Sequence, residues 1–268
     1  MLQAVIVPGS LAEAHAMLGS RQAATIVAGG TAIMPLLNYG TDDFTTLVSL
    51  RKAGLGSVSI GDGKATIGAA TTLSALLDEE NLAFLGPALD AIASPTIRNM
   101  ATVGGNLFVK QPYGDLAACL IALGASANVS SSTGTRSEPV ENVVQGLARD
   151  EIVTEVSFDL PPAGTFRFAK AGRKAFNSAA IVTVAAVVEM AEGLVRDCRI
   201  GLGGVGPYPM RAPSVEKALR GRPPDRVNVE AAAKLAVNDI APLDDAYASA
   251  WYRARVTPVH IRRALLGE

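Results

Sequence analysis

The chain has 268 residues and a net charge of −1; 49% of its residues are hydrophobic and 18% are charged. This composition is typical of a globular protein with a large core, and the length is sufficient for two domains. Nucleic acid or an anionic membrane would call for a clustered positive surface, and a membrane span needs roughly 20 apolar residues in a row. The sequence has neither feature, so we expect no nucleic-acid partner and no membrane span.

The N-terminus and the cysteines predict a cytoplasmic protein. The first residues, MLQAVIVPGSLAEA, lack the positive segment and the long apolar segment of a secretion signal. Thiols stay reduced in the cytoplasm, and the chain has only Cys119 and Cys198. An iron–sulfur cluster takes four ligands. We therefore expect two thiols without a chemical role and no metal site.

Residues 1–52 read as a small subdomain of strands and helices. Apolar runs at 5–7, 25–28 and 46–50 predict three strands. The sequence Ser10-Leu11-Ala12-Glu13 is a capping box, in which the serine oxygen and the glutamate each accept an N–H at the start of a helix. We expect that helix to end at Gly19.

Residues 53–162 form the second predicted subdomain. Asp62-Gly63 favours a tight turn between strands at 57–60 and 65–67. Pro161-Pro162 then breaks the chain, and we place a domain boundary there. Between the hairpin and this boundary, the pattern predicts helices at 73–77, 86–93 and 116–123, and strands at 127–130 and 152–160.

Residues 163–268 form the predicted C-terminal domain. Two β-branched runs, 180–190 and 194–202, are joined by Glu192-Gly193 and predict a hairpin. Helical patterns follow at 215–219, 229–237 and 247–256. Strands followed by helices indicate an α+β domain with a small antiparallel sheet.

A first glycine-rich loop, Gly29-Gly30-Thr31, follows the strand at 25–28. Glycine lets backbone N–H groups approach an anion closely, and successive N–H groups can form a nest for a diphosphate. A plain turn is the alternative. The loop does not match G-x-G-x-x-G, so the sequence gives no support to a nicotinamide dinucleotide fold.

A second such loop is Thr102-Val103-Gly104-Gly105-Asn106, followed nine residues later by Asp115. A carboxylate at that place can accept hydrogen bonds from ribose or ribityl hydroxyls. Alternatively, Asp115 only caps the helix at 116–123. Two loops of this kind on one chain can clasp a long diphosphate ligand from two sides.

These motifs resemble the FAD-binding subunits of the xanthine dehydrogenase and carbon monoxide dehydrogenase family, the molybdenum hydroxylases. Four blocks carry the resemblance and span most of the chain in order. They are AGGTAIMPLL, SPTIRNMATVGGNL with Asp115, FRFAKAGRKAFNSAAIVTVAA, and IGLGGVGPYPMRAPSVEKAL.

The resemblance implies an α+β fold: a two-subdomain, PCMH/VAO-like FAD-binding domain over residues 1–162 and a C-terminal domain over residues 163–268. It also implies noncovalent FAD, with the two loops holding the diphosphate and Asp115 the sugar region. The implied cofactor-binding residues are Val27, Ala28, Gly29, Gly30, Thr31, Ala32, Ile33, Met34, Ile92, Thr102, Val103, Gly104, Gly105, Asn106, Asp115, Ile152 and Lys170.

By the same resemblance, Lys170 lies beside the flavin ring. An ammonium there would stabilise the negatively charged reduced ring; a solvated strand lysine is the alternative. The sequence departs from some family members at Ser178, where they carry an aromatic residue beside the ring. Which residue covers the flavin face therefore stays open.

For function, the resemblance implies an electron-transfer subunit of an oxidoreductase. A large partner would carry molybdopterin and hydroxylate the substrate, and a small partner would carry two [2Fe–2S] clusters. The resemblance further implies that the three chains assemble as a dimer of heterotrimers. Electrons would pass from those clusters through FAD to an external acceptor. No catalytic residue is assigned to this chain, which shows no acid–base set near either loop.

Two other function classes remain open from the residues. One is a self-sufficient flavin oxidase, in which histidine often tethers FAD; His15 and His260 lie far from both loops in sequence. The other is a non-catalytic flavin-binding protein. For the electron-transfer function, we expect a docking surface at Phe108–Tyr113 and around Phe176, where aromatic and basic residues occur together.

Overall fold

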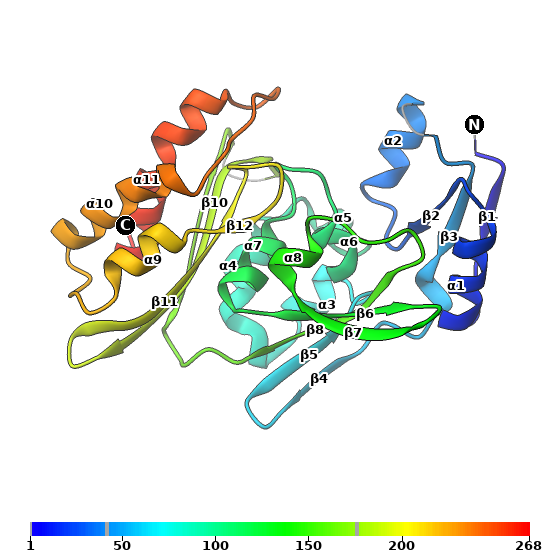
Figure 1. The fold of residues 1–268 in the computed structure, drawn as a ribbon, viewed down its shortest axis with the longest axis horizontal. Helices are drawn as coiled ribbons and strands as arrows, with labels where there is room; N and C mark the ends of the chain where they lie inside the picture. The colour runs from blue at the N-terminus through cyan, green and yellow to red at the C-terminus, as the bar shows by residue number, and fades with distance from the viewer. Residues whose placement is uncertain (1, 41–42, 175–176) are drawn as a thin grey trace.

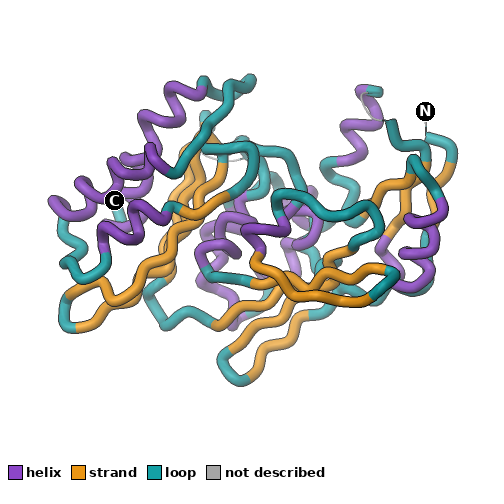
Figure 2. The backbone as a smooth tube through the Cα atoms, viewed as in Figure 1, coloured by secondary structure: helices purple, strands orange, loops and turns teal. Residues whose placement is uncertain are grey.

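The computed structural model describes all residues except 1, 41–42 and 175–176. The described residues form three sheets, one in each of three consecutive parts of the chain. Figures 1 and 2 show these parts side by side, with the N-terminal subdomain at one end and the C-terminal domain at the other. This arrangement confirms the predicted α+β fold.

The N-terminal subdomain has a parallel sheet of order β1-β3-β2. The Ser10 side chain accepts the N–H of Glu13, and the Glu13 carboxylate accepts the N–H of Gly9, so the predicted cap forms with a return contact one residue earlier. The helix runs one residue past Gly19. The elements are β1 (Ala4–Ile6), α1 (Leu11–Ser20), β2 (Ala24–Val27), α2 (Ile33–Tyr39) and β3 (Thr46–Ser49).

The second subdomain is built on an antiparallel sheet of order β4-β5-β8-β6-β7. Asp62 and Gly63 have φ values of 51° and 73°, the left-handed pair that a tight hairpin turn requires. Its strands are β4 (Val58–Gly61), β5 (Lys64–Gly68), β6 (Ser126–Ser131), β7 (Gly134–Pro139) and β8 (Ile152–Asp159). Its helices are α3 (Leu73–Leu77), α4 (Gly86–Asp90), α5 (Pro95–Arg98), α6 (Val103–Leu107), α7 (Asp115–Ala122) and α8 (Val140–Val143), with a short 3₁₀ turn at Glu80–Leu85; another 3₁₀ turn, Leu50–Lys52, ends the first subdomain.

His15 connects these two subdomains. It is buried on α1, and its ring nitrogens lie 2.9 Å from the carbonyl oxygen of Asp150 and 3.0 Å from Oγ of Ser130. Both partners belong to the second subdomain. Because a carbonyl only accepts, Nδ1 donates to Asp150, while Nε2 pairs with the Ser130 hydroxyl. The histidine is therefore a structural clamp between the subdomains.

The C-terminal domain has an antiparallel sheet of order β12-β11-β10-β9. Alternate residues of β10 serve different cores: Val182, Val184 and Ala186 pack under the C-terminal helices, whereas Ala185 packs against the second subdomain. The sheet is thus buried on both faces. The elements are β9 (Phe166–Gly172), β10 (Ala180–Ala191), β11 (Leu194–Gly203), β12 (Met210–Arg211), α9 (Pro213–Leu219), α10 (Arg226–Ala233), a 3₁₀ turn (Lys234–Asn238) and α11 (Ala250–Leu266).

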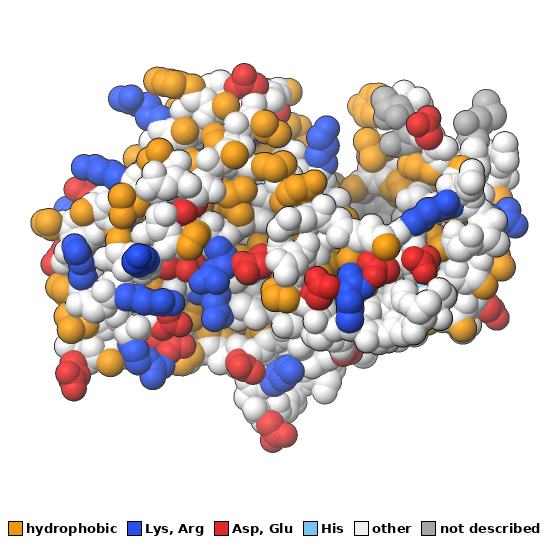
Figure 3. Space-filling model, in the orientation of Figure 1, with side chains coloured by type: hydrophobic (Ala, Val, Ile, Leu, Met, Phe, Trp, Pro, Cys, Tyr) orange, Lys and Arg blue, Asp and Glu red, His pale blue; other side chains and the backbone are white. Residues whose placement is uncertain are grey.

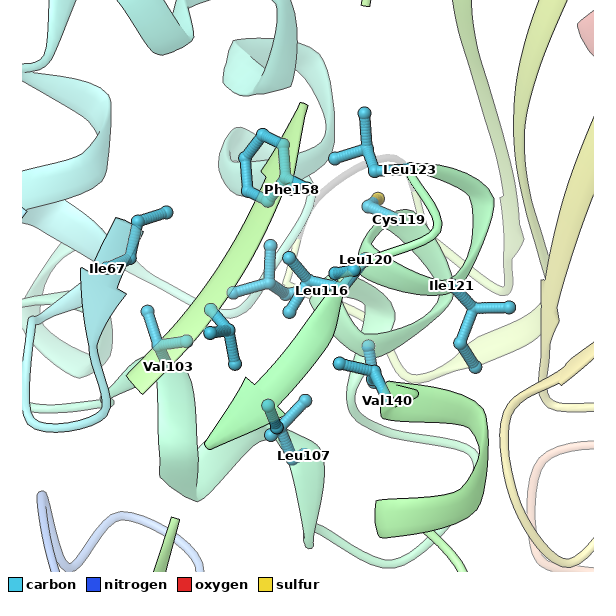
Figure 4. Packing of buried hydrophobic residues seen from close by; sticks show 14 of the residues in the cluster. Ile67, Val103, Leu107, Leu116, Cys119, Leu120, Ile121, Leu123, Val140 and Phe158 are labelled. Atoms are coloured by element: carbon cyan, nitrogen blue, oxygen red, sulfur yellow. The ribbon is translucent and has the colours of Figure 1, made fainter. Parts of the chain in front are cut away.

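Helix α7 is the central element, and all eight of its residues are buried. Figure 4 shows its apolar side chains meeting those of β5, β8 and α6 in the main core. On its other side the helix lies against β11. A Cβ atom at Gly201 would lie 2.0 Å from the carbonyl oxygen of Ala118, so only glycine permits this approach.

Some sequence predictions differ from the structure. Strand β7 was not predicted, because its sequence GTRSEP is largely exposed and polar and lacks an apolar alternation. Helix α11 begins at Ala250 rather than 247, after a Ser249 cap, and continues through Pro258 to Leu266 instead of ending at 256. The helix predicted over 86–93 ends at Asp90.

No helix among the described residues is both long enough and apolar enough to cross a membrane.

Substituting Gly201 by alanine should push α7 away from β11. We expect Gly201→Ala to lower the free energy of unfolding by about 1–3 kcal/mol, as overpacking typically does. Gly61→Ala is the control, since a Cβ there meets nothing within 4 Å. Thermal unfolding of both variants checks this, and equal midpoints would contradict the close packing of α7.

Candidate cofactor-binding site

The first glycine-rich loop offers free backbone donors. Gly30 adopts a φ of 75°, and its carbonyl accepts the N–H of Met34 at the start of α2. Within the described residues, the N–H groups of residues 29 to 32 donate to no acceptor. Such a run of unpaired N–H groups at the end of a strand is suited to an anion such as a diphosphate.

The second loop differs from the sequence interpretation, because its backbone donors are already used. The N–H groups of Val103 and Gly104 donate to Thr71 and Ala69 carbonyls, at 2.9 and 2.8 Å. Those of Gly105 and Asn106 donate to Oγ1 and the carbonyl of Thr102. The donor-rich backbone expected here is therefore wrong. In the part of the chain that the structure describes, the Thr102 N–H and the side chains of this segment are left for a ligand.

Asn106 provides such a side chain. It is only 8% exposed, and its Oδ1 is buried without a hydrogen-bond partner in the described part of the chain. Leaving a buried amide oxygen unpaired costs on the order of 1–3 kcal/mol. An orphaned polar atom of this kind fits a ligand that supplies the missing hydrogen bond.

The two loops touch each other. A Cβ atom at Gly29 would lie 1.8 Å from the carbonyl oxygen of Met100, two residues before Thr102. The loops come from different subdomains, so this close approach forms one continuous site from them. Figure 3 shows the surface hollowed between α2 and the central part of the molecule, an open groove rather than an enclosed cavity.

A buried ion pair lies between the second subdomain and the C-terminal domain. The Lys170 ammonium donates to Asp115 Oδ2 at 2.7 Å and to the carbonyl oxygen of Ala91 at 2.8 Å. The two charged side chains are 10% and 6% exposed, and the Thr183 hydroxyl donates to Asp115 Oδ1. The alternative of a solvated strand lysine is therefore wrong.

The same contacts contradict the alternative that Asp115 only caps helix α7. Asp115 is the first residue of α7, and Gly114, with a φ of 89°, is the residue that precedes the helix. No helix N–H bonds to the Asp115 side chain, because both of its oxygens face β9 and β10. Burial of a carboxylate is tolerated only when it is paired in this way.

Arg98 fixes the turn beside Lys170. It is buried, and its Nη1 donates to the carbonyls of Asp90, Ile92 and Ala93, at 3.3, 2.9 and 3.4 Å. Ala91 in the same turn accepts from Lys170. Two buried cations therefore hold four consecutive carbonyls, and Ile92 is held in a turn next to Lys170.

Ile152 lies apart from this group. Its side chain is 1% exposed and packs in the N-terminal core with Leu18, Val48 and Leu50. The structure thus brings together the two loops at one place, and Ile92, Asp115 and Lys170 at another, but it places the Ile152 side chain in the core.

Sequence reasoning missed Thr183 and Arg98. Both look like ordinary core or helix residues in the sequence. Thr183 bonds to Asp115, 68 residues earlier in the chain, and Arg98 bonds to carbonyls of the turn around Ile92. The available signal was their position inside the resembling blocks.

Cys119 and Cys198 are buried and free, and burial raises the pKa of the Cys198 thiol to about 12.

Part of the segment expected to form a docking surface is exposed. Phe108 and Tyr113 are each 45% exposed, and the Tyr113 hydroxyl lies 2.5 Å from that of Tyr247 in the C-terminal domain. Burial and this contact raise the pKa of Tyr113 to about 12, so it stays neutral at physiological pH. Phe176 lies outside the described residues.

A cavity of about 460 Å³ lies elsewhere, between α8 and β12. Its lining includes Glu141, Tyr208, Arg211 and Asp239, and neither glycine-rich loop contributes to it. The free donors, the orphaned amide and the buried ion pair thus lie outside this cavity.

Comparison with known proteins identifies the family. Residues 2–161 match the family described as the FAD binding domain in molybdopterin dehydrogenase. The chain belongs to this family. Residues 166–267 match the CO dehydrogenase flavoprotein C-terminal domain. The chain is thus the FAD-binding subunit of an oxidoreductase of the molybdenum hydroxylase type, which confirms the resemblance and the expected cofactor FAD.

Relatives agree with this assignment over nearly their whole lengths. The subunit is 31% identical to the carbon monoxide dehydrogenase medium chain of Afipia carboxidovorans, over 96% of this chain and 93% of that one. It is 28% identical to the xanthine dehydrogenase FAD-binding subunit of Escherichia coli O157:H7, over 96% and 92%.

Solved structures share the fold. A chain of the reconstituted CO dehydrogenase from Oligotropha carboxidovorans superposes with a TM-score of 0.92 at 29% identity, covering 99% of this subunit and 96% of that chain. A chain of quinoline 2-oxidoreductase from Pseudomonas putida 86 gives 0.90 at 27% identity, covering 100% and 96%.

Asn106→Leu should separate cofactor binding from folding. Leucine fills a similar volume and removes the unpaired buried oxygen, so we expect the cofactor-free subunit to be at least as stable as the wild type. FAD affinity should fall about tenfold, the effect of one lost hydrogen bond to a buried partner. Fluorescence titration with FAD measures the affinity.

Asn128→Leu is the matched control. The Asn128 amide already donates to Glu155 at 2.7 Å, so this variant should lose stability and keep its FAD affinity. Wild-type FAD affinity in Asn106→Leu would contradict a ligand contact at Asn106.

Proposed function

We propose that this subunit transfers electrons within a larger enzyme. It would receive them from [2Fe–2S] clusters on a small partner chain and pass them through FAD to an external acceptor. A large partner with molybdopterin would act on the substrate. The observation that carries the proposal is the FAD-binding region joined by a buried ion pair to a C-terminal domain that matches CO dehydrogenase flavoproteins.

The residues present fit FAD as a ligand. We propose that the free N–H groups of residues 29–32 bind the diphosphate, and that the Thr102 hydroxyl and Asn106 amide bind from the opposite subdomain. Asp115 and Lys170 would lie beside the sugar and ring regions. Val27, Ala28, Ile33 and Met34 flank the first loop. In the second loop Gly104 packs against Ala69, where a Cβ atom would lie 3.0 Å from that of Ala69. The bound cofactor supplies the redox chemistry.

We propose that this subunit works together with partner chains that hold the iron–sulfur clusters. Its two cysteines are buried on α7 and β11, and a [2Fe–2S] cluster takes four ligands. Several relatives are named medium chains or medium subunits. We therefore propose a complex with a large and a small chain, assembled as a dimer of heterotrimers, with the domain division of this subunit at residues 162/163.

Electrons from another chain require a contact surface near the cofactor. We propose the loop Phe108–Tyr113 for this contact. It joins Asn106 to Asp115 in sequence, and hydrogen bonds hold it to the C-terminal domain: Ala180 N–H to the Pro112 carbonyl and Gly204 N–H to Gln111 Oε1. Its half-exposed aromatic side chains suit an interface.

FAD should be bound noncovalently. The His15 ring is enclosed by its two hydrogen-bond partners, and His260 lies on α11, where burial lowers its pKa. Neither histidine lies on a glycine-rich loop or beside the ion pair. Acid precipitation should therefore release all of the yellow chromophore; flavin that stays on the denatured chain would contradict this expectation.

The isolated subunit should oxidise no organic substrate, although its flavin should accept electrons from a chemical reductant. We would supply the purified subunit with the compounds for which its relatives are named, including xanthine and carbon monoxide, and follow reduction of a dye. The control is the complex reconstituted with its partner chains. Dye reduction by the subunit alone, at the rate of the complex, would instead favour a self-sufficient oxidase.

A further inference from the structure

A row of three residues crosses the C-terminal sheet beneath Asp115. Lys170 on β9 and Gly203 on β11 both pair with Thr183 on β10. Directly paired residues place their side chains on the same face of a sheet, and here α7 covers that face. A Cβ atom at Gly203 would lie 3.3 Å from that of Thr183, so glycine leaves room for the threonine.

We propose that Thr183 is a positioning residue for the cofactor site and acts on Lys170 through the Asp115 carboxylate. Its hydroxyl donates to Oδ1 of Asp115, while the Lys170 ammonium donates to Oδ2 at 2.7 Å and to Ala91 at 2.8 Å. Thr183 is 0% exposed, so no water replaces its hydrogen bond. This inference rests on the proposed place of Lys170 beside the flavin.

The hydroxyl controls how strongly the carboxylate attracts the ammonium. A hydrogen bond donated to a carboxylate stabilises its charged form and lowers its basicity. Without that donor, Asp115 depends on Lys170 alone and draws the ammonium away from Ala91. The positive potential on the cofactor side then falls. Since the reduced ring carries more negative charge than the oxidised ring, the reduced cofactor loses the larger share of its stabilisation.

The test compares variants that differ by one hydroxyl in the full chain with bound FAD. Thr183→Val keeps the shape and removes the hydroxyl, and Thr183→Ser keeps the hydroxyl. We expect the affinity for reduced relative to oxidised FAD to fall about threefold to tenfold in Thr183→Val. A tenfold fall is a potential lower by about 30 mV for a two-electron couple. Spectroelectrochemical titration measures this potential.

Two further variants test the direction of the change in potential and provide a control. Asp115→Asn leaves the ammonium without a counter-charge and should raise the potential. Thr257→Val removes a second fully buried hydroxyl, which donates to the Arg253 carbonyl on α11 at 2.7 Å. This variant should lose stability and keep the wild-type potential. Thr183→Ser should also keep it.

The outcomes are distinct. A wild-type potential in Thr183→Val, with lowered thermal stability, would show that Thr183 is structural and would overturn the inference while leaving the proposed function intact. If the valine variant does not fold, the potentials of Thr183→Ala and Thr183→Ser are compared in its place, with the same two outcomes. A wild-type chain that binds no FAD would contradict the proposed function itself.

Discussion

The burial of α7 between two sheets is the constraint on which the rest of the structure depends. The helix supplies much of the main core on one side and lies directly on β11 on the other. Because Gly201 permits that approach, the N-terminus of α7 reaches the row of residues on β9 and β10. Asp115 can then meet Lys170 and Thr183, and a buried ion pair joins the two domains at this place.

The ion pair at that junction is better explained by function than by stability. Removing two charges from water costs several kcal/mol per ion, which their mutual attraction often only balances. Well-packed apolar residues would hold the domains together at least as well. A buried lysine whose charge is balanced by one carboxylate, and whose place is fixed by Ala91, would instead supply a defined electrostatic potential at the flavin position proposed here.

The two glycine-rich loops have different physical roles in the groove. The first presents unpaired N–H groups, whereas in the second the N–H groups of residues 103–106 are already bonded and the side chains of Thr102 and Asn106 are left. They come from separate subdomains that His15 and the Gly29–Met100 contact hold together. A ligand bound across both loops would add its binding energy to the stability of that arrangement.

The sequence by itself determined the class of fold, the two loops and Asp115, because glycines at strand ends and hairpin turns are local signals that survive without tertiary context. The Asp62-Gly63 turn and the Ser10 cap are of this kind. The tertiary structure alone decided which donors are free, since the acceptors of Val103 and Gly104 lie more than thirty residues earlier in the chain. It also decided the contacts of Thr183 and Arg98 and the burial of Ile152. Their partners are set by strand register and by the position of α7, and no local pattern of residues encodes either.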